Sequence, residues 1–284
     1  MIRLFVSDLD GTLLTKGKLT DRSVGDENRQ ALYTLVGSGV RFVAASGRHH
    51  SSSLMIAEDL GFPFDAIGSN GATVMRDGKC IRHRHVDREA ITYVIDTLYK
   101  MNVWNRLGCF VVNNNYEHIF NKPHHFPYNH FYEAYKNGQF GPCLEIPLNE
   151  YIHNPDSLVP TKLVIALREN ESIDEWLTIC RDKFSDWFDI LTSGENFIEF
   201  VAPGVSKGEA IRFLMKEYGI TEDEVAVVGD AANDISMFLT CNHSYCMDTA
   251  TPSVKKYAGK IVKTAAEAML DVLAKNELER TQQI

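Results

Sequence analysis

The chain has 284 residues, of which 44% are hydrophobic, so it is long enough to bury one large core or two ordinary ones. Acidic residues number 38 against 29 lysines and arginines, and the net charge of -9 disfavours binding to nucleic acid or to anionic membrane surfaces. We therefore expect the partner to be a small molecule.

Cysteine usage and the N-terminal sequence both indicate an intracellular protein. The opening run Ile2 to Val6 turns acidic at Asp8, too soon for a signal peptide, and no later run approaches membrane-spanning length. The six cysteines form no C-x-x-C pair, which argues against a zinc ribbon or a dithiol redox motif. We expect reduced thiols in a cytoplasmic protein.

Three short apolar runs rich in β-branched residues predict buried parallel strands at Leu4 to Val6, Val40 to Ala45 and Val225 to Val228. Between the first two, apolar residues recur at helical spacing from Asp26 to Val36, and glycines end the pattern. This order of strand, helix and strand indicates a right-handed βαβ unit.

The same alternation returns near the C-terminus. A helix is predicted from Lys207 to Tyr218, ended by Gly219, and another begins at Asp234 after the strand Val225 to Val228. The two ends of the chain should therefore build one sheet. The predicted fold class is α/β, a Rossmann-like, doubly wound parallel sheet core.

The stretch between Ser46 and Lys207 is several times longer than the roughly 30 residues that one βαβ repeat needs. We predict an inserted α+β domain at residues 84–190, which leaves 1–83 and 191–284 for the core. Between Ser46 and Lys207 the sequence predicts a hairpin around Asp77-Gly78 that leaves the first part, helices at Asp87 to Met101 and Ile173 to Phe184, and strands at Cys109 to Asn113, Lys162 to Leu167 and Phe197 to Val201.

Polar clusters follow two of the predicted strands near the N-terminus. Asp8-Leu9-Asp10-Gly11-Thr12 places two carboxylates at a strand's C-terminal end, where one can act as nucleophile and the other as proton donor. Ala45-Ser46-Gly47-Arg48 offers a hydroxyl and an approachable backbone N–H to a phosphate. For the first cluster the alternative is an acidic turn that caps the strand, and for the second it is an ordinary strand-to-helix turn.

Two further clusters lie in the C-terminal segment. Lys207 is the first residue of a predicted helix, with Ser206 as its N-cap. A cation at a helix N-terminus is unfavourable with respect to the helix dipole, so a nearby anion would explain its placement. A solvated lysine on the first turn is the alternative. Asp230, at the end of a strand, can bind a hard cation, and Asn233 and Asp234 can reach the same pocket; an acidic helix cap is the alternative.

The four clusters together predict one site for phosphoryl transfer. Asp8, Asp10, Asp230 and Asp234 would converge on a phosphate dianion, and each like-charge pair about 4 Å apart costs on the order of 4 kcal/mol at an effective dielectric constant of 20. Mg²⁺ and Lys207 are the expected compensation.

These residues resemble the haloacid dehalogenase superfamily, whose four motifs are matched in order by Asp8-x-Asp10-Gly-Thr, Ser46-Gly47, Lys207 and Gly229-Asp230-x-x-Asn233-Asp234. The long insertion, with Ser69-Asn70-Gly71-Ala72 before it, is similar to the Cof-type branch and its α/β cap.

The resemblance implies a role for each matched residue. Asp8 would attack phosphorus, and Asp10 would protonate the leaving oxygen and then activate water. Mg²⁺ would be held by Asp8, the backbone carbonyl of Asp10, and Asp230. Phosphate would be held by the Leu9 N–H, Ser46, Gly47, Lys207 and Asn233, with Asp234 supporting these groups. Arg48 and Asn70 are expected to be structural or peripheral.

Two features depart from the resemblance or stand outside it. Lys263-Thr264-Ala265-Ala266-Glu267 occupies the place where the family often has Asp-Gly-Val. The insertion also carries His118, His124, His125 and His130 among aromatic residues, for which surface histidines and a packed aromatic cluster are favoured over a zinc site.

The expected function is a Mg²⁺-dependent phosphatase that hydrolyses small phosphate monoesters through an aspartyl-phosphate on Asp8. A sugar phosphomutase would use the same pair of aspartates, and a non-catalytic sugar-phosphate sensor would not need both. The motifs leave the substrate open among sugar phosphates, nucleotides and cofactor phosphates, and they leave the oligomeric state open.

Overall fold

The computed structural model describes residues 1–14, 23–104, 106–113, 118–120, 143–144, 148–154, 159–168, 170–193 and 196–282. The chain forms two compact units, Met1–Ile81 with Ser206–Ile284, and Arg82–Val205. Each unit is described by itself.

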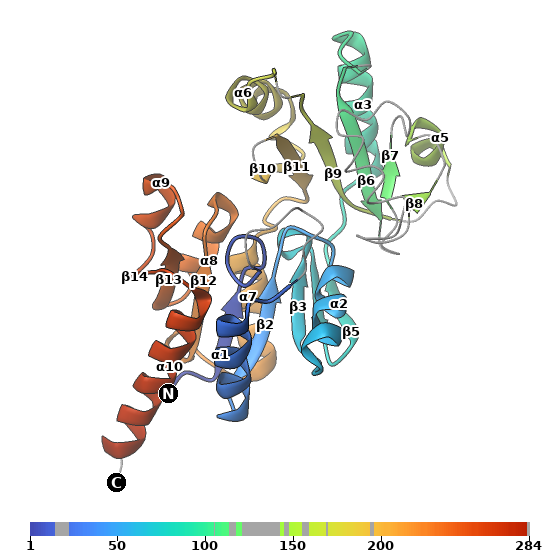
Figure 1. The fold of residues 1–284 in the computed structure, drawn as a ribbon. Helices are drawn as coiled ribbons and strands as arrows, with labels where there is room; N and C mark the ends of the chain where they lie inside the picture. The colour runs from blue at the N-terminus through green and yellow to red at the C-terminus, as the bar shows by residue number, and fades with distance from the viewer. Residues whose placement is uncertain are drawn as a thin grey trace. The chain divides into compact units, whose positions relative to one another are not determined.

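An eight-stranded sheet in the order β14-β13-β12-β1-β2-β3-β4-β5 organises the first unit (Figure 1). All its pairings from β14 to β3 are parallel, and β4 is antiparallel to β3. The strands are β1 (Leu4–Ser7), β2 (Arg41–Ala45), β3 (Asp65–Gly68), β4 (Thr73–Arg76), β5 (Lys79–His83), β12 (Val225–Gly229), β13 (His243–Met247) and β14 (Lys260–Val262).

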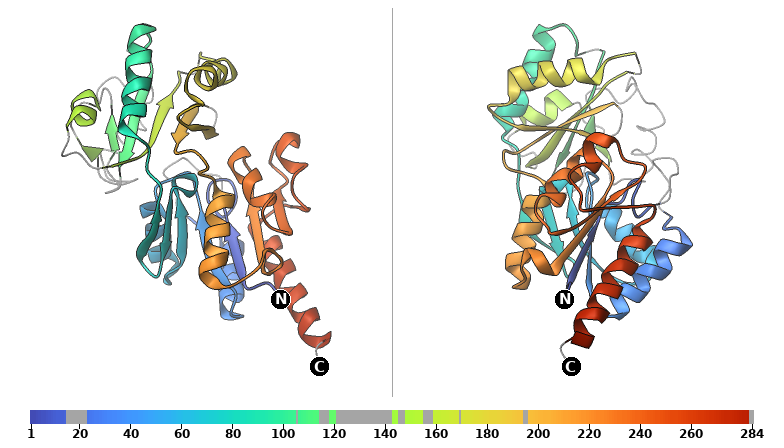
Figure 2. Two further views of the ribbon diagram at one scale, coloured as in Figure 1. Left: turned by 180° about the vertical axis from the view of Figure 1, so that it is seen from behind. Right: turned by 90° about the vertical axis from the view of Figure 1, so that its left-hand side faces the viewer.

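Helices cover both faces of this sheet, so alternate residues of the central strands enter two different apolar clusters. Phe5 packs with α1 (Asp26–Gly37), α2 (Ser51–Leu60) and α10 (Ala265–Gln282), whereas Leu4 and Val6 pack with α7 (Lys207–Tyr218) and α8 (Ile235–Phe238). Figure 2 (right) shows α7 on one side of the strands and α1 with α10 on the other. The short helix α9 (Pro252–Lys255) contacts β13.

This arrangement confirms the predicted doubly wound α/β core, built from both ends of the chain. It also explains the continuous apolar runs, because a parallel strand covered on both faces has no solvent side. The predicted helix from Lys207 to Tyr218 has the predicted bounds, and Gly219 ends it in the left-handed conformation, φ 61°.

The second unit is an α+β domain built on a six-stranded sheet in the order β10-β11-β9-β6-β7-β8. Among the described residues, β7 and β8 pair in parallel and the other neighbouring strands of this sheet pair antiparallel. Its elements are α3 (Arg88–Lys100), β6 (Gly108–Asn113), β7 (His118–Phe120), β8 (Cys143–Leu144), α5 (Leu148–His153), β9 (Pro160–Ala166), α6 (Ile173–Phe184), β10 (Asp189–Ser193) and β11 (Phe197–Val201).

The second unit extends further along the chain than residues 84–190. β11 was assigned to the core segment 191–284, but it lies between β10 and β9 in the second sheet, and the unit ends at Val205. The sequence identified the strand, but a short apolar run carries no information about which sheet its neighbours belong to.

Candidate active site

The carboxyl ends of three neighbouring strands bring the first polar clusters together. β1 pairs in parallel with β12 on one side and β2 on the other, so Asp8, Asp230 and Ser46 leave the sheet at the same edge. The Asp8 N–H donates to the Val228 carbonyl at 2.9 Å, which continues the β1–β12 pairing to the nucleophile candidate. Open α/β sheets place their ligands at this edge.

Gly11 lets the loop after β1 turn against Asp230. Its φ is +79°, and a Cβ added there would lie 2.5 Å from Asp230 Oδ2, so a larger residue would be strained and would collide. The neighbouring Thr12 hydroxyl donates to Asp230 Oδ1 at 3.0 Å. The two acidic clusters, far apart in sequence, are therefore joined by a direct bond.

Lys207 lies between two aspartates at the start of α7. Its Nζ donates to Asp8 Oδ1 at 2.5 Å and to Asp234 Oδ1 at 2.6 Å, and its side chain is fully buried. Burial alone would lower the pKa of Lys207, but the two carboxylates outweigh it and raise the pKa. The buried lysine is therefore charged, and its position against the helix dipole is explained by the two anions.

Asp234 supports the site from the far side of Lys207. Its Oδ2 accepts the backbone N–H groups of Asp230 and Ala231, both at 2.9 Å, while Oδ1 accepts Lys207. The position of Gly229 is equally constrained, because a Cβ there would lie 2.5 Å from the Asp234 carboxylate. Asp234 thus fixes both the loop after β12 and the ammonium group.

The carboxylates carry more negative charge than Lys207 can balance. Burial raises the pKa of Asp8, and the Asp234, Asp230 and Asp10 carboxylates raise it further against the opposing effect of Lys207. Burial, and then Asp234, raise the pKa of Asp230 to about 6. A cation bound here would reverse both effects.

The arrangement fits a hard divalent cation. Asp8, Asp230 and Asp234 each offer an oxygen, and these oxygens lie within 4.8 Å of one another. Asp234 already accepts three donors, whereas Asp8 Oδ2 and Asp230 Oδ2 accept no hydrogen bond from the described residues. An all-oxygen donor set with raised carboxylate pKa values suits Mg²⁺.

Asp10 points to a different partner from Asp8. Its two carboxylate oxygens accept from Arg48, one from Nε at 2.8 Å and the other from a terminal guanidinium nitrogen. Arg48 was expected to be structural or peripheral, but it contacts the predicted acid–base residue directly. The only sequence signal for this was its position immediately after Ser46-Gly47.

Three of the predicted phosphate-binding residues, Ser46, Gly47 and Asn233, lie around the turn Ser69–Gly71. Ser46 is buried, and its Oγ accepts the Arg48 backbone N–H at 3.0 Å. A Cβ on Gly47 would lie 3.1 Å from Asn70 Oδ1, and Asn233 Nδ2 donates to the same oxygen at 3.0 Å. The Leu9 side chain is buried in the core, and phosphate binding by its N–H stays a prediction.

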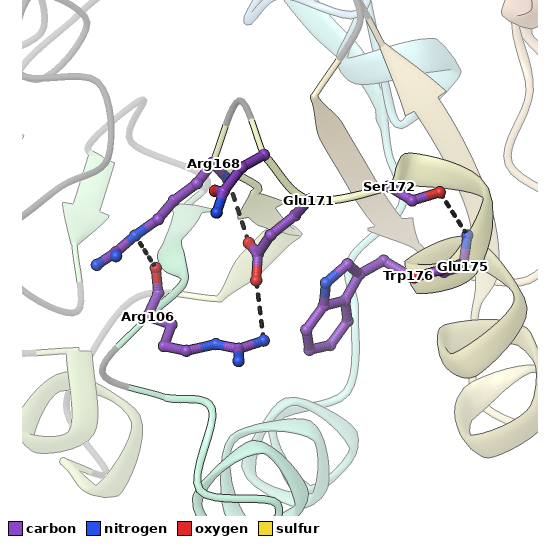
Figure 3. Close-up of a pocket in the computed structure, with 7 residues that line it drawn as sticks. Arg106, Arg168, Glu171, Ser172, Glu175 and Trp176 are labelled. Atoms are coloured by element: carbon purple, nitrogen blue, oxygen red, sulfur yellow. Dashed lines mark hydrogen bonds and ion pairs between the residues drawn. The ribbon is translucent and has the colours of Figure 1, made fainter.

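The second unit contains a cavity of about 320 Å³ beside the start of α6 (Figure 3). Glu171 accepts from Arg106 at 2.9 Å and from the Arg168 backbone N–H at 3.2 Å, while Trp176 and Glu175 complete the wall. Two arginines and two glutamates balance one another, so this cavity offers no excess positive charge to a phosphate. His124, His125 and His130 lie outside the described residues, and His118 is described for its backbone alone, as the first residue of β7.

Comparison with known proteins decides the family. A family model described as haloacid dehalogenase-like hydrolase matches residues 5–273, which include all four motifs. The chain belongs to this family. The resemblance seen in the motifs is thereby confirmed. Separately, no helix in the described part of the chain is both long and apolar enough to cross a membrane.

Individual relatives of this hydrolase are distant but cover nearly its whole length. It is 26% identical to the 5-amino-6-(5-phospho-D-ribitylamino)uracil phosphatase YbjI of Escherichia coli over 96% of each chain. It is 27% identical to an HMP-PP phosphatase of Serratia proteamaculans, over 90% of this chain and 87% of the relative. A haloacid dehalogenase-like hydrolase from Bacteroides thetaiotaomicron has the same fold, with TM-score 0.76 at 23% identity, covering 96% of this chain and 100% of that one.

Proposed function

We propose that this hydrolase is a Mg²⁺-dependent phosphatase that cleaves small phosphate monoesters through an aspartyl-phosphate on Asp8. The observation that carries the proposal is the buried Asp8 carboxylate, held by Lys207 on one oxygen and crowded by Asp230 and Asp234. A nucleophile must be ionised and fixed. Lys207 fixes Asp8 and favours its ionised form, and a bound cation would offset the burial and the neighbouring carboxylates that oppose ionisation. The phosphatase names of the two relatives support the same chemistry.

In the first step, an Asp8 oxygen forms a bond to phosphorus while the bond from phosphorus to the leaving oxygen breaks. Asp10 gives a proton to that oxygen, so the product leaves as an alcohol. In the second step, a water oxygen attacks phosphorus, Asp10 takes the water proton, and the bond between Asp8 and phosphorus breaks. Asp8 and Asp10 return to their starting states, and inorganic phosphate is released.

The surrounding residues balance charge during both steps. Mg²⁺ held by Asp8, the Asp10 backbone carbonyl and Asp230 would neutralise the carboxylates and the phosphate dianion. Lys207 keeps the Asp8 carboxylate oriented, and Ser46, Gly47, Asn233 and the Leu9 N–H hold the phosphate oxygens.

The pair with Arg48 determines which of the two proton transfers Asp10 can carry out in this structure. A carboxylate paired on both oxygens with a guanidinium is an acceptor of protons and not a donor. Asp10 in this state can activate water, whereas protonation of the leaving oxygen requires the pair with Arg48 to open. Substrate binding is the event that would open it.

Small phosphorylated metabolites are the proposed substrate class. The two relatives are named for a phosphorylated ribitylaminouracil and for HMP-PP. A protein with a net charge of -9 gains no long-range attraction for polyanions, so local groups must capture a compact phosphate.

The test is turnover of p-nitrophenyl phosphate with and without Mg²⁺. We expect EDTA to abolish phosphate release and Mg²⁺ to restore it, while Ca²⁺ substitutes poorly because its coordination is looser. Release of inorganic phosphate into solution separates a phosphatase from a mutase, and any turnover separates it from a sensor. Full activity in excess EDTA would refute the metal assignment.

A further inference from the structure

The turn Ser69–Gly71 holds three consecutive residues in the left-handed region, with φ values of 49°, 58° and 107°. Only the last is glycine. Two successive non-glycine residues in this region are uncommon, and such backbone persists where the surroundings determine it and where a site uses it. The side chain of Asn70 is 1% exposed, so the turn is held inside the protein.

This turn contacts three of the four motif loops. The Asn70 N–H donates to the Ser46 carbonyl at 3.0 Å, and the Ser69 N–H donates to the Arg48 carbonyl at 2.8 Å. A Cβ on Gly71 would collide with the carbonyl oxygen of Ser206, the residue before Lys207. The third loop is contacted through Asn233, whose Nδ2 donates to Asn70 Oδ1 at 3.0 Å.

The bond to Asn70 determines which way the Asn233 amide faces. With the Asn233 amide reversed, two carbonyl oxygens would face each other across 3.0 Å. Asn233 Oδ1 is buried and has no hydrogen-bond partner among the described residues, so it supplies no competing restraint. The amide is therefore fixed with Nδ2 toward Asn70, and its second N–H is left for another acceptor.

We propose that Asn70 is a positioning residue, which fixes the Asn233 amide so that its second N–H points at the substrate phosphate. This inference rests on the proposed function, in which Asn233 helps to hold phosphate. Without Asn70, the Asn233 amide can rotate and present its carbonyl oxygen to the anion. The cost should appear in phosphate affinity.

The experiment measures binding of inorganic phosphate by calorimetry in the presence of Mg²⁺. Asn70→Gly keeps the left-handed backbone and removes the amide, whereas Asn70→Ala also imposes strain at φ 58°. We expect both variants to weaken phosphate binding to the same extent, by about 3- to 10-fold, which is typical of one neutral hydrogen bond. Both variants lose a buried hydrogen bond, and Asn70→Ala should lower the melting temperature further than Asn70→Gly because of the added backbone strain.

Two controls separate positioning from a general loss of structure. Asn102 is an exposed asparagine with φ 57° in the second unit, so Asn102→Gly makes the same chemical change elsewhere and should leave phosphate binding unchanged. In an Asn233→Ala background, Asn70→Gly should cause no further loss, because there is no amide left to orient.

Wild-type phosphate affinity in Asn70→Gly would overturn the inference. So would an equal loss from Asn70→Gly whether or not Asn233 is present, since Asn70 would then act by another route. If Asn233→Ala binds phosphate as tightly as wild type, the role of Asn233 fails and the role of Asn70 fails with it. Mg²⁺-dependent phosphate release tests the catalytic proposal independently of all these results.

Discussion

Lys207 is fully buried, and two carboxylates share its ammonium group. The sequence showed a lysine at a helix start, and the unfavourable helix dipole there predicted a nearby anion. It could not show that Asp10 would turn to Arg48, because that choice depends on side-chain directions after two different strands. Residue identity at a strand end was predictable, whereas the pairing of charges across loops was not.

Changing Asp8 or Asp10 to asparagine should affect turnover and phosphoenzyme formation in different ways. Asp8→Asn removes the nucleophile and should abolish both turnover and phosphoenzyme. Asp10→Asn removes only the proton donor and acceptor, a contribution of about 10²- to 10⁴-fold, so this variant should be slow rather than inert.

The leaving group should separate the two steps of Asp10→Asn. p-Nitrophenol leaves without much protonation, so we expect a burst of p-nitrophenol followed by slow hydrolysis and a labelled Asp8. The measurement is rapid-quench kinetics with an alkyl phosphate for comparison. Equal losses for both esters, with no burst, would assign Asp10 a different role.

Replacing the buried ammonium group should also affect folding. Lys207→Met keeps a similar length of side chain but leaves Asp8 and Asp234 buried without a cation. We expect a loss of about 3–5 kcal/mol in the free energy of unfolding, together with loss of activity. Urea denaturation measures this, and Lys216→Met, on the exposed last turn of the same helix, is the matched control. Equal stability of the two variants would contradict the account of Lys207.

At the scale of elements, the start of α10 explains the departure from the family pattern. The Glu267 N–H donates to Thr264 Oγ1 at 3.2 Å, and the Lys263 N–H donates to the Glu267 carboxylate at 2.7 Å, so this run caps the helix. The buried Asn28 joins α10 to the loop after β1, since its amide accepts the Ala266 N–H and donates to the Leu13 carbonyl, both at 2.9 Å. The capping function is local and readable from the sequence, whereas the partner of Asn28 is not.

Asp271 should make the docking of α10 dependent on pH. Burial would raise its pKa, but bonds from Lys260 and Tyr245 at 2.6 Å and from Lys275 at 3.1 Å lower the pKa to about 2. A carboxylate whose pKa is depressed on folding stabilises above its unfolded pKa of about 4 and loses this contribution as pH falls toward 2.

The Asp271 side chain is 24% exposed and its partners Lys260 and Lys275 are 55% and 40% exposed, so water screens both pairs and we expect Asp271→Asn to cost only about 1 kcal/mol at pH 7. The difference between variant and wild type should shrink to about half by pH 3. Urea denaturation at the two pH values measures it. A difference that is independent of pH would mean that packing, and not charge, is lost.

At the scale of the whole molecule, the sequence predicted the core assembled from both ends and the presence of an inserted α+β unit. Short strands without an apolar run are harder to predict from the sequence. β3 (Asp65–Gly68) and β13 (His243–Met247) carry little intrinsic strand signal. They exist because neighbouring strands pair with them, which is a property of the assembled sheet. The same reason made the end of the second unit unpredictable.

The first unit should fold without the second. Both faces of its sheet are covered by helices of its own, so replacing residues 82–205 with a short Gly/Ser linker removes no layer of that core. We expect a cooperative thermal transition and retained Mg²⁺-dependent turnover of p-nitrophenyl phosphate, but a flattened ranking across a panel of phosphate esters. A folded truncated chain with the full protein's ranking would show that residues 82–205 do not set specificity.

The bond between Lys207 and Asp8 joins residues 199 positions apart. During synthesis at about 5–20 residues per second, Lys207 is therefore made roughly 10–40 s after Asp8, and β12 follows β1 after a similar delay. Over that interval β1 presents an unpaired edge, and Asp8 lacks the ammonium group of Lys207. The nascent chain should thus be sensitive to protease until residue 229 has left the ribosome, and early resistance of ribosome-bound fragments would show that another partner covers the edge. We therefore expect the nascent chain to need a chaperone more than the mature fold does.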